Sequence, residues 1–399
     1  MRAGRVGIVG GGIGGLTAAL SLLRRGFDVQ VFERAAALTE VGAGVQISPN
    51  ASRVLHGIGL AEELAEAGVR PLAWHQRRWD DGRTLLRTPL ADPLEAAFGY
   101  PHYQMHRADL LAALARAVPA ERVHLGHRLT AFEDDGDRVT AHFAGGATAE
   151  VDVLVGADGI HSLVRRLLFG PENPHFTGCV AYRGLVPAER LRELELEVSA
   201  QVWMGPGAHF VHYFVSGRRL VNFVAITERE TWTRESWTDR GEVADALAAF
   251  AGWHPQVRAI IGAVDETFVW ALFDRTPLQR WSAGRVTLLG DACHAMLPFM
   301  AQGAAQAIED GVTLAACLAE PGTDVVAALR RYEELRIPRA GRIQAMSTTN
   351  KDRFHLPDGP EQQLRDAEMA AGSTDWSFKA VAWIYEHDAA DIARAPTGT

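Results

Sequence analysis

The sequence of 399 residues is poor in cysteine and contains no long apolar run. Its three cysteines, Cys179, Cys293 and Cys317, lie far apart, so they predict neither a disulfide framework nor a metal-ligand cluster. No stretch reaches the roughly 18–20 apolar residues of a membrane span. The first five residues lead directly into a strand pattern, which leaves no room for a signal peptide. We therefore expect a cytoplasmic protein without a membrane partner.

Basic charge is also scarce. The chain has 40 Lys and Arg against 49 Asp and Glu, which gives a formal net charge of −9. A nucleic-acid-binding protein needs a basic surface to neutralise phosphates, so we expect no nucleic-acid partner. The patterns H-E-x-x-H, C-x-x-C and G-x-S-x-G are missing as well. Their absence argues against a metal site and against acyl-transfer chemistry.

Glycines, in contrast, are concentrated near the N-terminus. A buried-strand pattern at residues 6–9 leads into Gly10-Gly11-Gly12-Ile13-Gly14-Gly15, which matches G-x-G-x-x-G, and a helical pattern follows to residue 25. A second strand pattern, residues 29–32, ends at Glu33. We expect Gly10, Gly12, Gly14 and Gly15 to let a dinucleotide pyrophosphate approach the helix N-terminus, with Glu33 at the adenosine ribose. The loop alone does not separate FAD from NAD, and a glycine-rich turn with a surface glutamate is the alternative.

The remaining patterns are of two kinds. Some predict antiparallel strands, and others predict buried strands and helices like those of the N-terminal β-α-β unit. Residues 72–90 predict two antiparallel strands around a turn, and residues 176–273 predict further strands rich in aromatics. The strands and helices that belong with the N-terminal β-α-β unit are predicted at residues 110–117, 151–156, 285–289, 303–318 and 327–347. The chain should therefore be α/β, with one sheet domain assembled from separate stretches and a ligand in the cleft beside the β insertion.

Two further motifs resemble those of a known family. Residues 156–165 are similar to the G-A-D-G-x-x-S-x-x-R signature of class A FAD-dependent aromatic hydroxylases, and residues 289–298 resemble their second FAD motif, G-D-A-x-H-x-x-x-P. The branch that the chain resembles most contains salicylate, 3-hydroxybenzoate and 6-hydroxynicotinate monooxygenases, because of segments 41–47, 106–110 and 300–304. The resemblance spans roughly residues 5–345.

This resemblance implies an α/β fold like that of p-hydroxybenzoate hydroxylase, with a Rossmann-like FAD-binding domain, a mostly β substrate domain and C-terminal helices. The implied division is a discontinuous FAD-binding domain of residues 1–70, 101–175 and 276–345, a substrate domain of residues 71–100 and 176–275, and a C-terminal segment of residues 346–399. The sequence leaves open whether the protein is a monomer or a homodimer.

The resemblance also implies how FAD is held. Asp291 would bond the ribitol chain, and Gln46 would lie beside the isoalloxazine ring. The helix N-terminus at Gly303 and Ala304 would face the flavin pyrimidine and stabilise its negative charge after reduction. The other implied cofactor residues are Glu33 and Arg34 at the adenosine, Arg107 at the phosphate and ribitol, Leu129, and Asp158 at the approach of the nicotinamide cofactor. The structural alternatives are a helix cap for Asp291, a surface ion pair for Arg107 and a strand-end turn for Asp158.

The implied activity is hydroxylation of a small aromatic acid or phenol, with or without loss of a carboxylate. NADH or NADPH would reduce FAD, and the reduced flavin would react with O2 to give a C4a-hydroperoxide that an electron-rich ring attacks. A base near the substrate hydroxyl would help, because deprotonation raises the electron density of the ring. The alternatives are an oxygenase that tailors a larger natural product, a flavin reductase and a non-catalytic FAD-binding module.

The strand pattern at residues 208–214 supplies the candidate substrate residues. His209 and Tyr213 share one face of this strand. They resemble the substrate-side His and Tyr of the hydroxybenzoate and hydroxynicotinate enzymes, and His209 is the candidate proton acceptor. Two hydrogen-bonded strand residues without a catalytic role are the alternative. His102, His106 and His294 are further candidates, of which His294 is the most typical of a structural residue.

Two positions depart from the family pattern. Phe299 stands where several relatives have a polar side chain, which removes a base or a hydrogen bond at that point. Ala301 stands where many relatives have glycine. We expect Ala301 to be tolerated through a negative φ.

Overall fold

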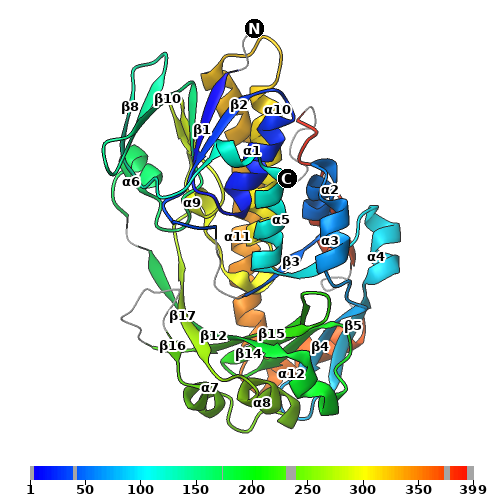
Figure 1. Ribbon diagram of the computed structural model, residues 1–399. Coiled ribbons are helices and arrows are strands. Elements are labelled where there is room, and N and C mark those ends of the chain that lie inside the picture. Colours follow the sequence, from blue (N-terminus) through cyan, green and yellow to red (C-terminus); the bar gives the residue numbers. More distant parts are fainter. Residues whose placement is uncertain (1–3, 39–42, 173, 231–239, 373–377, 393–399) are drawn as a thin grey trace.

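The computed structural model describes residues 4–38, 43–172, 174–230, 240–372 and 378–392. The expectation of no signal peptide falls partly on residues 1–3, and two residues of the branch-like segment, Val41 and Gly42, also lie outside the described residues. Two sheets dominate the molecule, and a long helix, α11 (Val325–Phe354), runs between them (Figure 1). The mixed α/β fold class expected from the sequence is confirmed.

The first sheet contains the predicted β-α-β unit. Its strand β1 (Arg5–Val9) is central and pairs in parallel with β2 (Asp28–Phe32) on one side and β11 (Val153–Gly156) on the other. The strand order is β18 (Ser282–Ala283), β19 (Val286–Leu288), β11 (Val153–Gly156), β1 (Arg5–Val9), β2 (Asp28–Phe32) and β7 (Val123–His124). A three-stranded sheet lies beside it and consists of β10 (Thr148–Val151), β9 (Val139–Phe143) and β8 (Leu129–Asp134). Segments far apart in sequence therefore meet around β1.

The second sheet has eight strands and contains the predicted β insertion. Its order is β16 (Arg240–Gly241), β17 (Thr267–Asp274), β12 (His175–Pro187), β15 (Leu220–Glu228), β14 (Ala208–Val215), β13 (Ala200–Gly205), β4 (Ala73–Arg78) and β5 (Thr84–Pro89). Two helices, α7 (Val243–Ala249) and α8 (Pro255–Gly262), pack on its outer face. The inner face contacts the single turn η3 (Pro298–Met300) and helix α12 (Pro360–Ala370). The inner face therefore looks toward the first sheet (Figure 1).

Short elements connect these layers. A two-stranded sheet pairs β3 (Gly44–Ile47) with β6 (Tyr103–His106). The helices of the first lobe are α1 (Ile13–Leu23), α2 (Pro49–Gly57), α3 (Ala61–Ala67), α5 (Arg107–Ala117), α6 (Leu163–Phe169), α9 (Asp291–His294) and α10 (Gly303–Leu318). The remaining elements are α4 (Ala91–Phe98), α13 (Phe378–Tyr385), η1 (Ala120–Arg122) and η2 (Ala188–Leu194). Among the helices in the described ranges, none combines the length and hydropathy that a bilayer crossing needs.

Helix α11 is longer than the sequence pattern predicts and is fastened to α10 by buried charges. It runs seven residues beyond the predicted end at Ser347. Arg336, which is fully buried, donates from Nε to Asp310 at 2.6 Å and from Nη1 to Glu309 at 2.5 Å. Arg339 donates from Nε to the same Glu309 carboxylate at 2.7 Å. Burial alone would raise the pKa of Glu309, but the two guanidinium groups overcome it and hold the pKa well below its usual range.

We expect Arg336→Met to lower the free energy of unfolding by about 3–5 kcal/mol, because two buried carboxylates would then share one cation fewer. Arg330→Met is the matched control, since it makes the same change at an exposed position of α11. The control should change the free energy of unfolding by less than about 0.5 kcal/mol. Urea unfolding followed by circular dichroism measures both. Equal losses in the two variants would refute the role given to the buried charges.

Candidate active site

The glycine loop after β1 is packed on one side and open on the other. Gly10 has φ +115°, and a Cβ there would lie 2.3 Å from the carbonyl oxygen of Ala157. A Cβ on Gly15 would lie 2.1 Å from the Gly10 carbonyl oxygen, and one on Gly14 would lie 2.6 Å from a leucine side chain. A Cβ on Gly12 would meet nothing within 4 Å. The loop is thus tightly held from behind while its front, at the N-terminus of α1, is accessible.

This accessible face fits the phosphates of a dinucleotide. Helix α1 has no side-chain cap and no acidic residue in its first turn, so its N–H groups and dipole are left for an anion. The Glu33 carboxylate lies across the loop, where it accepts from the Gly11 N–H at 2.7 Å and from the Ala35 N–H at 2.8 Å. Arg34 follows and is exposed. The Glu33 carboxylate therefore lies against the glycine loop, and Arg34 is next to it in the sequence.

A second turn presents Asp291 close to the glycine loop, since a Cβ on Gly14 would lie 2.6 Å from the Leu289 side chain. Gly290 has φ +65°, and its N–H donates to the buried Asp310 carboxylate at 2.9 Å. The same carboxylate is 2.6 Å from Nε2 of His294, so this histidine is part of the scaffold. Asp291 begins α9 with its side chain exposed, and Gly290 is the residue that precedes the helix. The buried pairs thus fix the backbone from which Asp291 projects.

Asp291 borders a small cavity of about 90 Å³ between the two lobes. Segment 291–298 forms one wall, and β12 and β17 form the opposite wall. Ile160, from the motif at residues 156–165, completes it. The cavity therefore joins both FAD-like motifs to the inner face of the eight-stranded sheet.

Arg183, on β12, lines this cavity and was not predicted from the sequence. Its guanidinium carbon lies 4.1 Å from the centre of the Trp270 ring. Among the described residues, no carboxylate forms an ion pair with Arg183, and its Nε has no hydrogen-bond partner. Burial lowers the pKa of Arg183 to about 10, with Tyr213 acting in the opposite direction. An inner cation without a carboxylate is costly, so this arrangement favours an anionic ligand.

The inner sheet face connects Arg183 to the predicted strand residues. Arg183 is paired with Val224 on β15, and Val224 is paired with Val211 on β14. Two strand spacings separate Arg183 from Val211, which is about 10 Å. His209 and Tyr213 flank Val211 on the same face of β14. Val224 and Val211 thus form a small apolar surface, the valine floor. Arg183 lies at one end of it, and His209 and Tyr213 lie at the other.

Tyr213 lies directly against strand β3. A Cβ on Gly44 would lie 2.5 Å from the Tyr213 hydroxyl, so this approach requires glycine. The Gly44 N–H donates to Oδ1 of Asn222 at 2.7 Å, whereas Nδ2 of Asn222 has no partner. Gln46, on the same strand β3, has an unpartnered Oε1. Burial raises the pKa of Tyr213, which keeps its hydroxyl protonated. Unpartnered buried amides beside β3 are what a site for a polar ring would present.

His209 is buried, and its Nδ1 is committed to a partner. This atom lies 2.7 Å from Nε2 of His355, a residue that the sequence analysis did not single out. The Phe299 ring packs on His209 with 5.0 Å between centroids, so it closes this end of the site without a polar group. Burial lowers the pKa of His209 well below its usual value. His209 is therefore neutral before any ligand binds.

The other predicted cofactor residues lie at or just before the starts of three different elements. The Arg107 N–H donates to the Ala43 carbonyl at 2.8 Å and opens α5 beside β3. Leu129 is buried at the start of β8. The Asp158 carboxylate accepts from the Ser162 hydroxyl at 2.5 Å and from the Leu163 N–H at 2.7 Å. Asp158 therefore stabilises the start of α6, as in the strand-end alternative.

Two of the alternative histidines are not connected to the His209 end of the site by any hydrogen bond in the described ranges. His102 is buried with both ring nitrogens unpartnered, and burial lowers its pKa to about 4. Its ring meets Trp74 edge-on, with 6.4 Å between centroids. His106 is partly buried at the end of β6, and its Nε2 has no partner.

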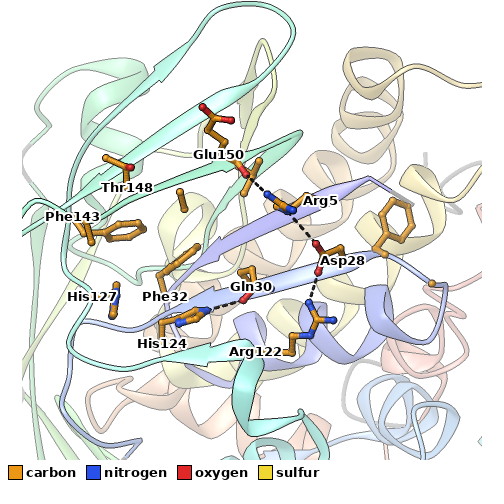
Figure 2. A pocket seen from close by; sticks show the side chains of 15 residues that line it. Arg5, Asp28, Gln30, Phe32, Arg122, His124, His127, Phe143, Thr148 and Glu150 are labelled. Atoms are coloured by element: carbon orange, nitrogen blue, oxygen red, sulfur yellow. Dashed lines mark hydrogen bonds and ion pairs between the residues drawn. The ribbon is translucent and has the colours of Figure 1, made fainter. Parts of the chain in front are cut away.

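A wider cavity lies elsewhere, between β2, β7, β9 and β10, and has a volume of about 800 Å³ (Figure 2). Arg5 and Arg122 both pair with the Asp28 carboxylate in its wall. His124 Nε2 lies 2.7 Å from Oε1 of Gln30. These charged and polar groups satisfy one another, and no predicted site residue lines the cavity. We therefore take the inner sheet face as the candidate active site.

The expectation of a negative φ at Ala301 was wrong. Ala301 follows η3 with φ +51° and ψ +33°, in the left-handed region. The chain must turn there to pass from η3 into α10, and the Cβ of alanine is strained in that conformation. Glycine in the relatives has a direct physical reason at this position.

We expect Ala301→Gly to raise the free energy of unfolding by about 0.5–1 kcal/mol, because left-handed strain of about 1–2 kcal/mol exceeds the entropy cost of glycine. Ala319→Gly is the control, since Ala319 ends α10 with φ −85°. That change should instead be destabilising by about 0.5–1 kcal/mol. Thermal unfolding of both variants measures the two signs. A loss of stability in Ala301→Gly would show that the left-handed turn carries no strain.

Known proteins resemble this chain over almost its whole length. The family model described as FAD binding domain matches residues 4–347. A 3-amino-4-hydroxybenzoate 2-monooxygenase of Streptomyces platensis is 44% identical over 388 residues, covering 97% of each chain. A 6-hydroxynicotinate 3-monooxygenase of Pseudomonas fluorescens is 40% identical over 350 residues, covering 87% of this chain and 91% of that protein.

Solved structures agree with these sequence matches. A salicylate hydroxylase substrate complex superposes with a TM-score of 0.84 and 28% identity, covering 100% of both chains. Klebsiella pneumoniae HpxO complexed with FAD and uric acid also gives 0.84, with 28% identity, and covers 99% of this chain and 98% of that one.

Proposed function

The chain belongs to the FAD-binding domain family as a flavin-dependent aromatic monooxygenase, and from that premise we propose that it hydroxylates a small aromatic acid bearing a ring hydroxyl. The relatives named above act on an aminohydroxybenzoate and a hydroxynicotinate, both of which carry a carboxylate and a ring oxygen. NADH or NADPH and O2 are the proposed co-substrates.

The observation that carries this proposal is Arg183. Its guanidinium has no carboxylate partner among the described residues and borders the cavity beside Asp291. A substrate carboxylate would supply the missing anion through charge-assisted hydrogen bonds. The ring would then lie on Val224 and Val211, with its hydroxyl toward His209 or Tyr213. The limited volume of the cavity favours a small acid over a larger natural product.

Two sets of residues would hold FAD. The glycine loop and the N-terminus of α1 would take the pyrophosphate, with Glu33 and Arg34 at the adenosine and Arg107 near the phosphate and ribitol. Leu129 would be a further cofactor-binding residue. Asp291 would bond the ribitol, Gln46 would meet the ring edge, and Gly303 and Ala304 would direct the N-terminus of α10 at the pyrimidine. Asp158 would shape the nicotinamide approach through the α6 turn. When bound and reduced, FAD supplies the activation of oxygen that side chains cannot provide.

The protein's own part is to prepare the substrate. Neutral His209 accepts the proton of the ring hydroxyl, which raises the electron density of the ring. Tyr213, which stays protonated, donates a hydrogen bond to an oxygen of the substrate. Phe299 and the valine floor keep water away from the reacting atoms.

The function is tested by adding hydroxybenzoates, aminohydroxybenzoates, hydroxynicotinates and neutral phenols to the FAD-loaded enzyme. We expect the acids to stimulate NADH or NADPH oxidation with O2 uptake, and mass spectrometry to show one added oxygen, with or without loss of CO2. Stimulation by neutral phenols alone would contradict the proposal.

We expect Arg183→Met to raise KM for the preferred acid by about 10- to 100-fold, since hydrogen bonds to charged groups contribute about 1.5–3 kcal/mol. KM for the matching phenol without a carboxylate should not change. Arg190→Met is the control, because Arg190 forms an exposed pair with Asp265 at 3.1 Å. An equal rise for the acid and the neutral phenol would remove Arg183 from carboxylate recognition.

We expect Asp291→Ala to weaken FAD binding by about 10- to 100-fold, through loss of charge-assisted bonds to the ribitol. Titration of the apoprotein with FAD, followed by quenching of flavin fluorescence, gives the dissociation constant. Asp265→Ala serves as the control, because its side chain is 83% exposed and paired only on the surface with Arg190. Unchanged FAD affinity in Asp291→Ala would assign Asp291 to helix α9 alone.

A further inference from the structure

His209 is the first member of a chain of hydrogen bonds that leads to the surface. His209 Nδ1 lies 2.7 Å from His355 Nε2, and His355 Nδ1 lies 2.9 Å from Glu228 Oε1. The two histidines are 2% and 5% exposed, whereas the Glu228 side chain is 47% exposed. The three groups come from β14, from the residue after α11 and from the last residue of β15.

Backbone bonds fix this chain in place. The Gly207 N–H donates to the His355 carbonyl at 3.0 Å, and the Glu228 N–H donates to the Gly207 carbonyl at 2.8 Å. The turn that leads into β14 is therefore bonded to the backbone of both His355 and Glu228. The His355 ring also packs 5.8 Å from the Phe299 ring, at the edge of the site. These backbone hydrogen bonds therefore hold His209, His355 and Glu228 in line with one another.

Glu228, at the end of the chain, determines which nitrogen of each histidine donates a hydrogen bond and which accepts one. An ionised Glu228 can only accept, so the proton of neutral His355 is on Nδ1 and its Nε2 is an acceptor. His209 must then donate from Nδ1, which leaves the lone pair of His209 on Nε2. His209 Nε2 is therefore the atom available to take a proton from a bound hydroxyl.

We propose that His355 and Glu228 are positioning residues that hold His209 in this tautomer and conduct the substrate proton to solvent. The inference rests on the proposed role of His209 as the proton acceptor. The substrate O–H bond breaks as His209 Nε2 gains a proton. His209 Nδ1 then releases its proton to His355 Nε2, His355 Nδ1 releases its proton to Glu228, and Glu228 releases one proton to water. The reverse transfer restores the starting tautomers when the product oxygen is reprotonated.

The surroundings of His355 keep its imidazole neutral before a substrate proton arrives. Burial lowers the pKa of His355, and the Glu228 carboxylate acts in the opposite direction. The other charged groups that face it are Lys351 and Asp352, on the last turns of α11. Lys351 is bonded to the Thr177 carbonyl at 3.0 Å, and His209 faces His355 from β14. Among these groups, Glu228 is the one that is hydrogen-bonded to the His355 ring and also exposed to solvent.

The test compares His355→Phe and Glu228→Gln with the wild-type enzyme loaded with FAD. The probe is 3-amino-4-hydroxybenzoate, whose ionisation on binding is followed by ultraviolet difference spectroscopy against pH. We expect His355→Phe to raise the apparent pKa of the bound hydroxyl by about one unit and to lower kcat/KM about tenfold. Glu228→Gln keeps an acceptor oxygen but no charge, so it should shift the profile less. FAD affinity and KM should stay unchanged.

His254→Phe is the matched control, because His254 packs on Trp203 at 5.0 Å on the other face of the sheet. It should leave the ionisation profile unchanged. An unshifted profile in His355→Phe, with normal FAD binding, would overturn the relay while the proposed function stands.

A second measurement does not depend on turnover. Nitrogen NMR of histidine-labelled holoenzyme should show His209 protonated on Nδ1, and Glu228→Leu should abolish this preference. If 3-amino-4-hydroxybenzoate and the other acids are not turned over, the proposed function fails, and the NMR result still decides the hydrogen-bond chain. An Nε2-protonated His209 in the wild-type enzyme would overturn it.

Discussion

The buried charges between α10 and α11 are the constraint on which the rest of the site depends. Glu309 and Asp310 lie side by side on α10, and Arg336 and Arg339 meet them from α11. Asp310 also receives the Gly290 N–H, so the same cluster fixes the turn that presents Asp291. Because each charge is compensated inside the protein, the helices cannot slide without exposing an unpaired ion to an apolar interior.

Because that cluster joins α10 to α11, it fixes the position of the N-terminus of α10 relative to the C-terminus of α11. The N-terminus of α10 follows the left-handed turn at Ala301, and α11 ends at Phe354 next to His355. Both places border the inner face of the eight-stranded sheet. A single rigid helix pair therefore sets the flavin side and the histidine side of the candidate site relative to each other.

Much of the first lobe could be predicted because its signals are local. The glycine loop, the strands around it and the helix at 303–318 each follow from short-range patterns, and α10 begins and ends at the predicted residues. The motif at residues 289–298 likewise pointed to Asp291. Local patterns sufficed because the glycine loop, its flanking strands and helix α10 are each formed by residues close together in the sequence.

The substrate side was only partly accessible to such reasoning. His209 and Tyr213 could be named from one strand, but Arg183 meets them only through the pairing of three strands. An arginine in the otherwise apolar run at residues 179–186 was a signal that could have been used. His355 depends on α11 continuing past its amphipathic pattern, and the φ of Ala301 depends on where η3 must join α10. Register, helix length and turn geometry are long-range properties.

The partial exposure of Glu228 has a consequence for how a sealed chamber could work. Oxygen chemistry of this kind is wasted when bulk water enters, yet every cycle must exchange protons with the medium. A hydrogen-bonded row of two imidazoles and a carboxylate allows proton exchange without the entry of water. Protons pass along its hydrogen bonds, whereas water molecules do not. The pocket can therefore be dry and remain in protonic contact with its surroundings.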